Sequence, residues 1–544
     1  MIVNVGKTIW KRGDLFVWLT GAALALSLIL TTALLIGIFV NAMGSFWPGE
    51  IQILNLNDGS KVLGSQVGRE IIPNYGTPDD RQETYRVQIK KANRDIYNSD
   101  FVWIDENKIK TVQFPEEVLV VVRKEWGLFF GYIKEVLDGD QVIASGTRES
   151  LKSVQSLLPE VTAKNKKIEQ IEKKEIGYIN YKLERIRLKL KKLKLKEISE
   201  GPVVDALNNK IPELQMKYNE LEKKLLGLRN SQNVKLILQT VEGQEKTLPI
   251  AQVFGIYNPN SFSLLDKLGY FFNSINDFFW DDPREANTEG GVFPAIFGTF
   301  FMVMIMSALA TPLGVLAAFY LREYARQGTM VSIVRIAVNN LAGVPSIVFG
   351  VFGVGFFIYF IGGTIDQLFF PEALPTPTFG TGGILWASLT MALLTVPVVI
   401  VSTEEGLAAV PKGTREASLA LGATKFETSW RVVIPAVMPS ILTGLILAMA
   451  RAAGEVAPLM ITGVVKLAPS LPVDGLWPFI HLERKFMHLG FHIYDVGFQS
   501  PNVDAARPMV FATTLLLILM VILLNIAAIY LRNRLRKKLS ASAV

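Results

Sequence analysis

Two charged side chains interrupt an otherwise apolar stretch of the sequence, and they are the first candidates for chemistry. After Pro439, about 22 residues run with only Arg451 and Glu455 charged, close to the ~20 residues that cross a hydrocarbon core as a helix. An isolated charge at that depth costs roughly 2.5 to 3.5 kcal/mol on insertion scales. A spacing of four places both residues on one face of a helix, so they can form a buried structural ion pair. In the alternative interpretation, Arg451 offers a crossing anion a transient forked donor and Glu455 orients it.

A polar segment directly before this stretch has the pattern of two helices joined by a turn. In residues 414–433, apolar side chains recur at helical spacing on both sides of Gly422. Gly422 allows a sharp turn or a close backbone approach that a side chain would block, and Pro435 can start the next helix. A loop held rigidly against the end of a membrane helix can carry force from a partner into a pore. The alternative is an inert amphipathic loop.

The remaining polar residues do not form a catalytic set. The sequence contains no GxxxxGK[ST] phosphate loop, no nucleophile motif and no cysteine, which excludes disulfides and metal thiolates. Its three histidines, His481, His488 and His492, fall in one segment. His488 and His492 are four residues apart and can share a helix face, but no third ligand lies nearby, so we predict no metal site. Energy for any work must come from another subunit.

Composition places the chain in a membrane. Of its 544 residues, 50% are hydrophobic, which is too apolar for an ordinary soluble protein of this size. The formal net charge of +7 does not indicate nucleic-acid binding, because the basic residues gather in the flanks of apolar segments and in one helical arm.

The N-terminal region predicts a membrane anchor. Residues 1–14 carry Lys7, Lys11 and Arg12, and residues 15–40 form an uninterrupted apolar run of spanning length. We therefore expect a cytoplasmic N-terminus. A cleaved signal peptide is the alternative, but the run is too long for a signal core and no clean small-x-small site follows it.

Five further apolar spans make six membrane helices in total. They cover residues 292–321, 331–361, 383–403, 438–464 and 509–531. The loops predicted to face the cytoplasm are rich in Lys and Arg, whereas residues 362–382 contain neither. This asymmetry predicts that both termini and the loop around Glu416 are cytoplasmic. The long outside loop, residues 466–507, could lie across the outer mouth.

Residues 41–290 are polar, and this topology places them outside. Their first part alternates or clusters strand-forming residues in IQILNL, YRVQIKK, FVWI, KTVQF and EVLVVV, with turns at residues 57–59 and 138–140. Apolar residues then recur at steps of three and four in two runs separated by Gly201 and Pro202. This pattern predicts an antiparallel coiled-coil hairpin at about residues 161–232. Strand-like residues 234–241 follow, so the hairpin is an insertion in a β domain.

The first of the two predicted arms of the hairpin is strongly basic. Residues 164–200 hold 13 Lys or Arg against 6 acidic residues. A solvated coiled-coil surface and a docking arm for an anionic partner both fit these numbers, and the residues do not choose between them.

Several motifs resemble one family of transport proteins. The EAA loop of permease subunits in bacterial ATP-driven importers is matched in spacing by Glu416, Ala417, Gly422, Val432, Ile434 and Pro435. Ser418 departs from it, since the family prefers a third Ala there. AGVPSIVFG (residues 342–350), AFYLREYA (318–325) and ARAAGEVAPL (450–459) resemble the phosphate-specific importer, more closely its PstA type than its PstC type. The resemblance covers roughly residues 291–535.

This resemblance implies roles for particular residues. Glu416, Ala417, Gly422, Ile434 and Pro435 would belong to a coupling helix that sits in a groove of an ATPase subunit. Similar permeases carry the equivalents of Arg451 and Glu455 in the translocation path. Asn339, Asn340 and Pro345 could line the pore or form a hinge, and a packing role fits them equally well.

We therefore predict a mostly α membrane protein of the bacterial cytoplasmic (inner) membrane. An anchor (residues 15–40) and a type I ABC importer permease core (291–535) supply six transmembrane helices, with a coupling loop at 404–437 and a cytoplasmic tail at 536–544. Residues 41–290 form a periplasmic β domain with the coiled-coil insertion.

The predicted function is that of a permease subunit, not an enzyme, in an ATP-driven phosphate importer. The family implies a PstC-like permease, two ATPase subunits that hold ATP and Mg, and a periplasmic phosphate-binding protein as partners. The chain itself would bind no cofactor, and beyond these subunits it would contact the lipid bilayer and no nucleic acid. The alternatives are a permease for molybdate, sulfate or phosphonate, and an envelope scaffold or signalling protein derived from a permease.

Overall fold

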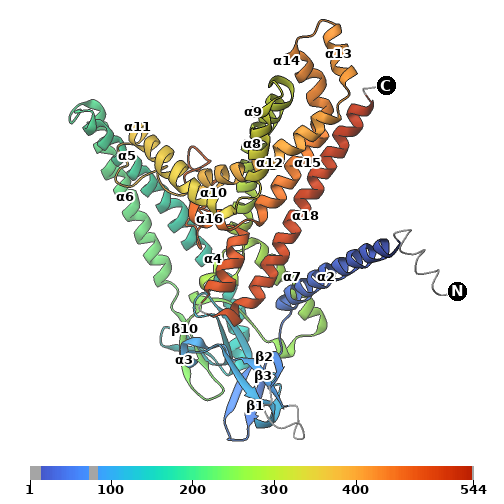
Figure 1. Ribbon diagram of the computed structural model, residues 1–544. Coiled ribbons are helices and arrows are strands. Elements are labelled where there is room, and N and C mark those ends of the chain that lie inside the picture. Colours follow the sequence, from blue (N-terminus) through green and yellow to red (C-terminus); the bar gives the residue numbers. More distant parts are fainter. Residues whose placement is uncertain (1–13, 73–83, 501, 542–544) are drawn as a thin grey trace, which may run out of the picture.

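Long helices and a β-rich part occupy opposite ends of the molecule. The computed structural model describes residues 14–72, 84–500 and 502–541, and most of them are helical. The strands gather at one end, and the helices α13 (Lys412–Ala420) and α14 (Lys425–Thr428) lie at the far end of the helical bundle (Figure 1). A helical hairpin leaves the β-rich part on the side away from the C-terminus (Figure 1).

The β-rich part contains two antiparallel sheets. The first has the order β4-β3-β2-β1-β5, and the second has the order β10-β9-β7-β6-β11, with β8 paired to β7. The strands are β1 (Gln52–Leu56), β2 (Lys61–Ile71), β3 (Tyr85–Lys90), β4 (Phe101–Asp105), β5 (Ile109–Gln113), β6 (Leu119–Arg123), β7 (Leu128–Asp138), β8 (Gln141–Ser145), β9 (Val234–Gln239), β10 (Glu245–Pro249) and β11 (Val253–Tyr257). Each segment predicted from β-forming residues is a strand, and the predicted turns contain Gly59 and Gly139 at positive φ.

The hairpin is an insertion between β8 and β9, as expected. Its first arm is one continuous helix formed by α4 (Thr147–Glu169), the π segment η2 (Gln170–Ile176) and α5 (Gly177–Leu195), and its second arm is α6 (Pro202–Asn230). Gly201 and Pro202 lie at the turn because glycine adopts the required positive φ and proline suits the first turn of a helix. The structure shows a helical hairpin, and coiled-coil packing along it stays a prediction.

The predicted start of the hairpin near residue 161 is wrong. The helix begins at Thr147, and its first turns pack on the second sheet, where Val154 and Val161 join buried strand residues such as Phe129 and Leu236. The π segment η2 explains why the heptad pattern did not extend back to this point, since a π turn adds a residue and shifts the helix face. The base of the hairpin is therefore part of the β core.

The described residues contain six helices long and apolar enough to cross a membrane, which confirms the predicted number. These are Phe16–Phe46 within α2 (Asp14–Phe46); Phe293–Tyr324, formed by α8 (Phe293–Phe319) and η6 (Tyr320–Tyr324); Ser346–Phe369, formed by α10 (Ser346–Phe352), η7 (Gly353–Gly362) and α11 (Gly363–Phe369); Ile384–Ala409, which is α12; Lys425–Gly454, formed by α14 (Lys425–Thr428), η8 (Ser429–Val433) and α15 (Ile434–Gly454); and Val503–Arg534 within α18 (Val503–Ala541).

Two of the predicted spans have wrong boundaries. The span expected at residues 331–361 is divided, because α9 (Thr329–Leu341) ends before Pro345 and the spanning helix begins at Ser346. Proline disfavours a helical conformation in the residue before it, and Pro345 itself has no N–H to donate. The span expected at 438–464 begins earlier, at Lys425, and ends at Gly454; the short helix α16 (Ala457–Thr462) follows it.

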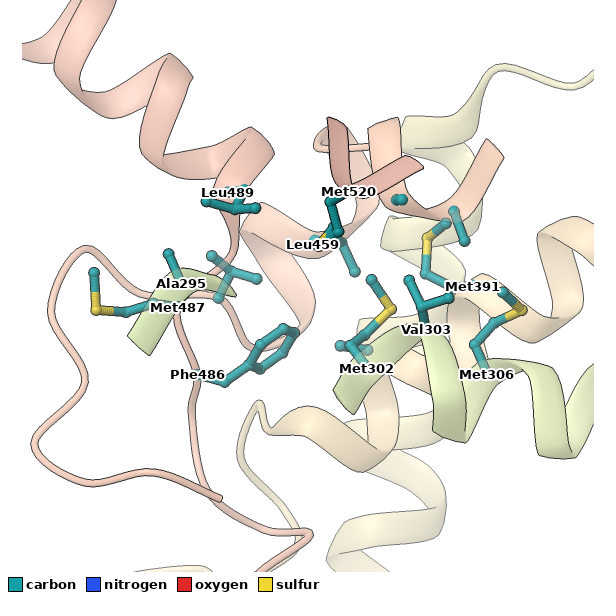
Figure 2. Close-up of a cluster of buried hydrophobic side chains, with 14 of the residues drawn as sticks. Ala295, Met302, Val303, Met306, Met391, Leu459, Phe486, Met487, Leu489 and Met520 are labelled. Carbon is teal, nitrogen blue, oxygen red and sulfur yellow. The ribbon is translucent and has the colours of Figure 1, made fainter. Parts of the chain in front are cut away.

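The core of the helical bundle forms around α12. Two-thirds of the residues in its apolar window are buried, whereas none of the residues in the apolar window of α2 is buried. Figure 2 shows Met302, Val303 and Met306 of α8 gathered near Met391 of α12 and Met520 of α18. At Gly314 a Cβ would lie 2.7 Å from the Val399 Cβ, so a small residue is needed for α8 and α12 to approach.

An amphipathic helix connects the β-rich part to the bundle. α7 (Leu264–Trp280) begins with a capping box between Ser263 and Asp266 and buries Phe278 against Phe46 at the end of α2. Another link is the 3.1 Å hydrogen bond that Gln88 of β3 donates to Asp504 of α18. Through α7 and this hydrogen bond, the β-rich part is joined to the end of α2 and the start of α18.

Candidate coupling loop and translocation path

The segment with EAA-like spacing folds as two short helices at the tip of the bundle. α13 (Lys412–Ala420) ends at a turn where Gly422 has φ of 85°, and α14 starts at Lys425 (Figure 1). Thr424 caps α14: its Oγ1 accepts from the Glu427 N–H at 3.2 Å, and the Glu427 carboxylate accepts from the Thr424 N–H at 2.9 Å. Glycine at 422 is thus required by the backbone, as the sequence indicated.

An arginine that sequence reasoning did not select fixes α13 to the bundle. Arg415 forms a 2.9 Å ion pair with Glu323 of η6 and donates to the Val410 and Leu407 carbonyls at 3.0 and 2.8 Å. These carbonyls lie at the end of α12, where helix carbonyl groups lack helical partners. Glu323 lies in a motif used for the resemblance and Arg415 directly precedes another, but nothing in the sequence indicated that these two segments meet.

The tip of the loop exposes large apolar side chains. Leu421, Phe426 and Trp430 are 90%, 67% and 64% exposed, and Leu419 is also exposed. Contiguous exposed apolar surface on a protein marks an interaction site. We call these four residues the loop-tip patch.

The five residues assigned to coupling have different environments. Glu416 and Ala417 are exposed on α13, and Gly422 is exposed at the turn. Ile434 and Pro435 are half-buried, and Ile434 packs on a cluster that includes Val433. Pro435 lies in the first turn of α15, as expected, although no break separates α15 from the segment before it. The π segment η8 precedes it, so one helix runs without interruption from Lys425 to Gly454.

Arg451 and Glu455 lie at the end of a helix and not at its middle. Arg451 is in the last turn of α15, and Glu455 follows Gly454 with extended backbone, ψ 136°. Arg451 Nε and Glu455 Oε1 are 3.5 Å apart, and the two side chains remain 32% and 23% exposed. The charges therefore pair, as a spacing of four allows, but at a helix break that keeps them partly exposed. Broken helices in transporters place polar groups beside a pathway.

The asparagine pair does not lie on a predicted span. Asn339 and Asn340 are exposed on α9, which is too short to cross a membrane, so they do not lie on a spanning helix as the span predicted at residues 331–361 implied. Pro345 lies at the start of α10. Within the described residues, no hydrogen bond joins either asparagine side chain to Arg451 or Glu455.

The three histidines are buried, yet they do not form a common cluster. His481 lies between carboxylates, with 3.1 Å from Nε2 to Asp474 and 3.2 Å from Nδ1 to Glu483. His488 accepts a hydrogen bond from the Gly490 N–H at 3.1 Å. Burial lowers the pKa of His488 to about 3 and that of His492 to about 4. Across the described ranges, no group of three or more His, Asp or Glu residues is arranged to hold a metal ion.

The spans, the helical loop and the charge pair at a helix break are features of a membrane permease. Residues 310–540 match the model of the family described as "Binding-protein-dependent transport system inner membrane component". A probable ABC transporter permease, YqgI of Bacillus subtilis, is 31% identical over 46% of this chain and 81% of its own length. The chain belongs to this family of ABC transporter permease subunits, which are transport components and not enzymes.

Within that family the chain is similar to the PstA type. The phosphate transport system permease protein PstA 1 of Mycobacterium tuberculosis is 34% identical over 45% of this chain and 71% of its own length. Among solved structures, the inward-facing MetNI methionine ABC transporter matches 45% of this chain and 94% of its own at 18% identity, with a TM-score of 0.31. The family match begins at residue 310, so the strands and the hairpin lie outside it.

Proposed function

We propose that this chain is the PstA-type permease subunit of an ATP-driven importer of inorganic phosphate. It would form half of the translocation pathway and bind no cofactor. Its partners would be a PstC-like permease, two ATPase subunits that hold ATP and Mg, and a periplasmic phosphate-binding protein. The substrate is taken from the similarity to PstA relatives and from the motifs that contain Arg451 and Pro345.

One observation carries the proposal: the loop-tip patch lies exposed on a segment with EAA-like spacing. An apolar surface at the far end of the bundle needs a protein partner, and Leu421 and Trp430 are of the kind that fill a groove. Glu416 is exposed on the same loop and can accept hydrogen bonds from the same partner. An ATPase subunit fits this position.

The geometry supports a direct mechanical connection from loop to pathway. Lys425–Gly454 is one helix, so a displacement of α14 moves Arg451 at its other end. Arg415 transmits the same movement to η6 through Glu323. In this mechanism, ATP binding closes the ATPase dimer and pulls on the loop, the spanning helices tilt to an outward-open state, and they relax inward after hydrolysis.

Arg451 would meet the substrate as the helices move. A guanidinium presents a planar fork that suits phosphate oxygens, and the pair with Glu455 at 3.5 Å is long enough to open without a large loss. Glu455 then pairs with Arg451 again after phosphate has passed, and this competition prevents Arg451 from binding phosphate too tightly. A purely structural ion pair is the competing role.

The proposed orientation puts the loop and both termini in the cytoplasm of a bacterial inner membrane, as the loop charges indicate. The β-rich part and the hairpin would then be periplasmic, with coiled-coil packing between α5 and α6. The core would have the type I importer arrangement, with domains close to residues 41–290 and 291–535.

Radiolabelled phosphate uptake tests the proposal. Cells that lack their own importer would express this permease with its partner subunits, either as wild type or with Glu416→Lys or Arg451→Gln. We expect wild-type uptake, and at least a tenfold loss in both variants at equal membrane levels. Arg534→Gln, an exposed arginine on α18 outside the coupling loop, is the matched control and should transport normally.

Each other outcome separates one part of the proposal from the rest. Normal uptake by Arg451→Gln would make the charge pair structural. Import of molybdate, sulfate or phosphonate in place of phosphate would overturn the substrate. If the wild type moves no oxyanion at all, a scaffold or signalling role derived from a permease would replace transport.

A further inference from the structure

The hairpin contacts two loops of the permease half. Tyr181 Oη of α5 donates to the Trp477 carbonyl at 2.6 Å. Farther along α5, Lys192 Nζ is 3.0 Å from Glu372 Oε1 and Lys191 Nζ donates to the Leu374 carbonyl. The first of these loops follows α16 and the second follows α11, which lies beside α5 (Figure 1). In the proposed orientation both loops border the outer mouth.

A cavity of about 600 Å³ lies between the hairpin and the loop that follows α16. We call it the hairpin groove. Its walls carry five cations, Lys182, Arg185 and Lys189 from α5 and Lys210 and Lys217 from α6. They also carry four aromatic side chains, Tyr178 and Tyr181 from α5 and Trp477 and Phe479 from the loop. Neither the hairpin alone nor the permease loop alone would form this site.

The hairpin groove has excess positive charge. Its one lining carboxylate, Glu213, is 2.7 Å from Lys217. The pKa of Glu213 lies below its ordinary value because Lys217 bonds to it, and Lys182 and Lys210 add their charges. In the part of the chain that the structure describes, no carboxylate forms an ion pair with Lys182, Arg185, Lys189 or Lys210. An anionic partner would supply the missing countercharge.

The aromatic side chains make the groove more than a charged surface. Trp477 and Phe479 are 64% and 54% exposed. The Arg185 guanidinium lies 5.6 Å from the centre of the Trp477 ring, so cation and ring are presented together. Exposed Trp, Tyr and Arg are the residue types that dominate protein–protein binding energy, and surrounding lysines speed the approach of an acidic partner.

We propose that the hairpin groove is a docking site for an acidic surface of the substrate-binding protein. This inference rests on the proposed function, because it needs the outward orientation. The family depends on a binding protein, yet the hairpin lies outside the matched residues, so the match itself does not assign this site. Acidic side chains of the partner meet Lys189 and Lys210, and an apolar side chain enters beside Trp477. Contact with both walls makes the hairpin part of the docking surface of the permease.

The test measures binding of the purified binding protein to the assembled importer in nanodiscs of neutral lipid. We expect Lys189→Gln/Lys210→Gln to slow association about tenfold at 50 mM salt and to have little effect at 300 mM, because salt screens the attraction. Trp477→Ala should speed dissociation about tenfold or more, which corresponds to roughly 1.4 kcal/mol or more. Lys223→Gln/Lys224→Gln, on α6 outside the groove, is the matched control and should bind like the wild type.

Wild-type binding by both groove variants, with melting temperatures unchanged, would overturn the docking site. Vesicles that contain phosphatidylglycerol give the competing measurement: if the groove variants lose vesicle binding and keep the binding protein, the occupant is anionic lipid and the proposal is wrong. The proposed substrate is tested separately. A wild type that docks its binding protein but imports no phosphate overturns only the substrate, and normal docking by the variants with phosphate import intact overturns only the groove.

Discussion

Two buried polar side chains of this protein differ in whether protein groups replace the hydrogen bonds that water would supply. Arg123 of β6 is almost fully buried but is neutralised by Asp95 at 3.0 Å, and it donates to the Gly127 and Trp126 carbonyls. His492 is equally buried, yet neither of its ring nitrogens has a hydrogen-bond partner among the described residues. The arginine keeps its charge because partners replace water, whereas the histidine has to stay neutral.

The buried histidines predict a loss of stability in mild acid. Unfolded histidine binds a proton near pH 6.5, whereas folded His488 and His492 do so only near pH 3 and 4, so the unfolded state takes up protons first as pH falls below 6.5. Each of the two histidines then lowers the free energy of unfolding by about 1.4 kcal/mol by pH 5.5. The melting temperature of the purified chain in detergent should therefore fall between pH 7.5 and 5.5.

His492→Phe provides the comparison for this prediction. Phenylalanine cannot titrate, so the fall in melting temperature between the two pH values should be smaller than in the wild type. An equal fall in both proteins would show that the acid sensitivity has another source.

At the scale of elements, the loop-tip patch and the pathway are connected by one long helix, and the turn before that helix controls its direction. Gly422 has φ of 85°, where a side chain with a branched Cβ is strained by roughly 1 to 3 kcal/mol. Changing the turn should tilt α13 relative to α14 without unfolding the bundle, since both helices are exposed at the tip.

Gly422→Val should therefore uncouple transport while the protein still accumulates in the membrane. We expect phosphate uptake to fall several-fold, while Gly422→Asn keeps most activity because asparagine tolerates this backbone region. Gly413→Ala is the control, since a Cβ there meets no atom within 4 Å and φ is not positive. Equal uptake by Gly422→Val and the wild type would contradict a coupling role for the turn.

At the scale of the whole molecule, the hairpin is built in two parts. Its base belongs to the β core through Val154 and Val161, whereas its upper part packs on itself and on the permease loops. An ion pair between Glu172 and Arg229 joins the two arms where these parts meet. A deletion that begins at Val161 would remove a side chain of the β core, whereas one that begins above Glu172 would remove only buried residues of the two hairpin arms, Ile179, Ile186, Val204 and Leu225.

Replacing residues 173–228 by a short Gly-Ser turn should remove the hairpin groove and preserve the rest of the fold. The melting temperature should change little, and binding-protein association should weaken at least as much as in the groove variants. Full association by this truncated protein would place docking elsewhere on the chain. A loss of membrane accumulation would show that the upper hairpin is needed for folding.

Local signals in the sequence determined which elements form. Six apolar runs of spanning length, strand-forming segments between turn residues, and glycine at the tip of the loop all act over a few neighbours, so the membrane helices, the strands and the turn at Gly422 could be predicted. The spacing of Arg451 and Glu455 was likewise sufficient to predict that they pair.

Only the tertiary structure decided where those helices end and which surfaces they leave open. Hydropathy runs continuously across Glu455, yet the helix breaks there, and Leu459 of the next segment joins the bundle core formed by residues distant in sequence. Tertiary packing likewise leaves Leu421 and Trp430 exposed, and it brings Tyr181 into contact with the loop that contains Trp477. Hydrophobic burial depends on the total surface that a fold brings together, and a linear pattern does not specify that surface.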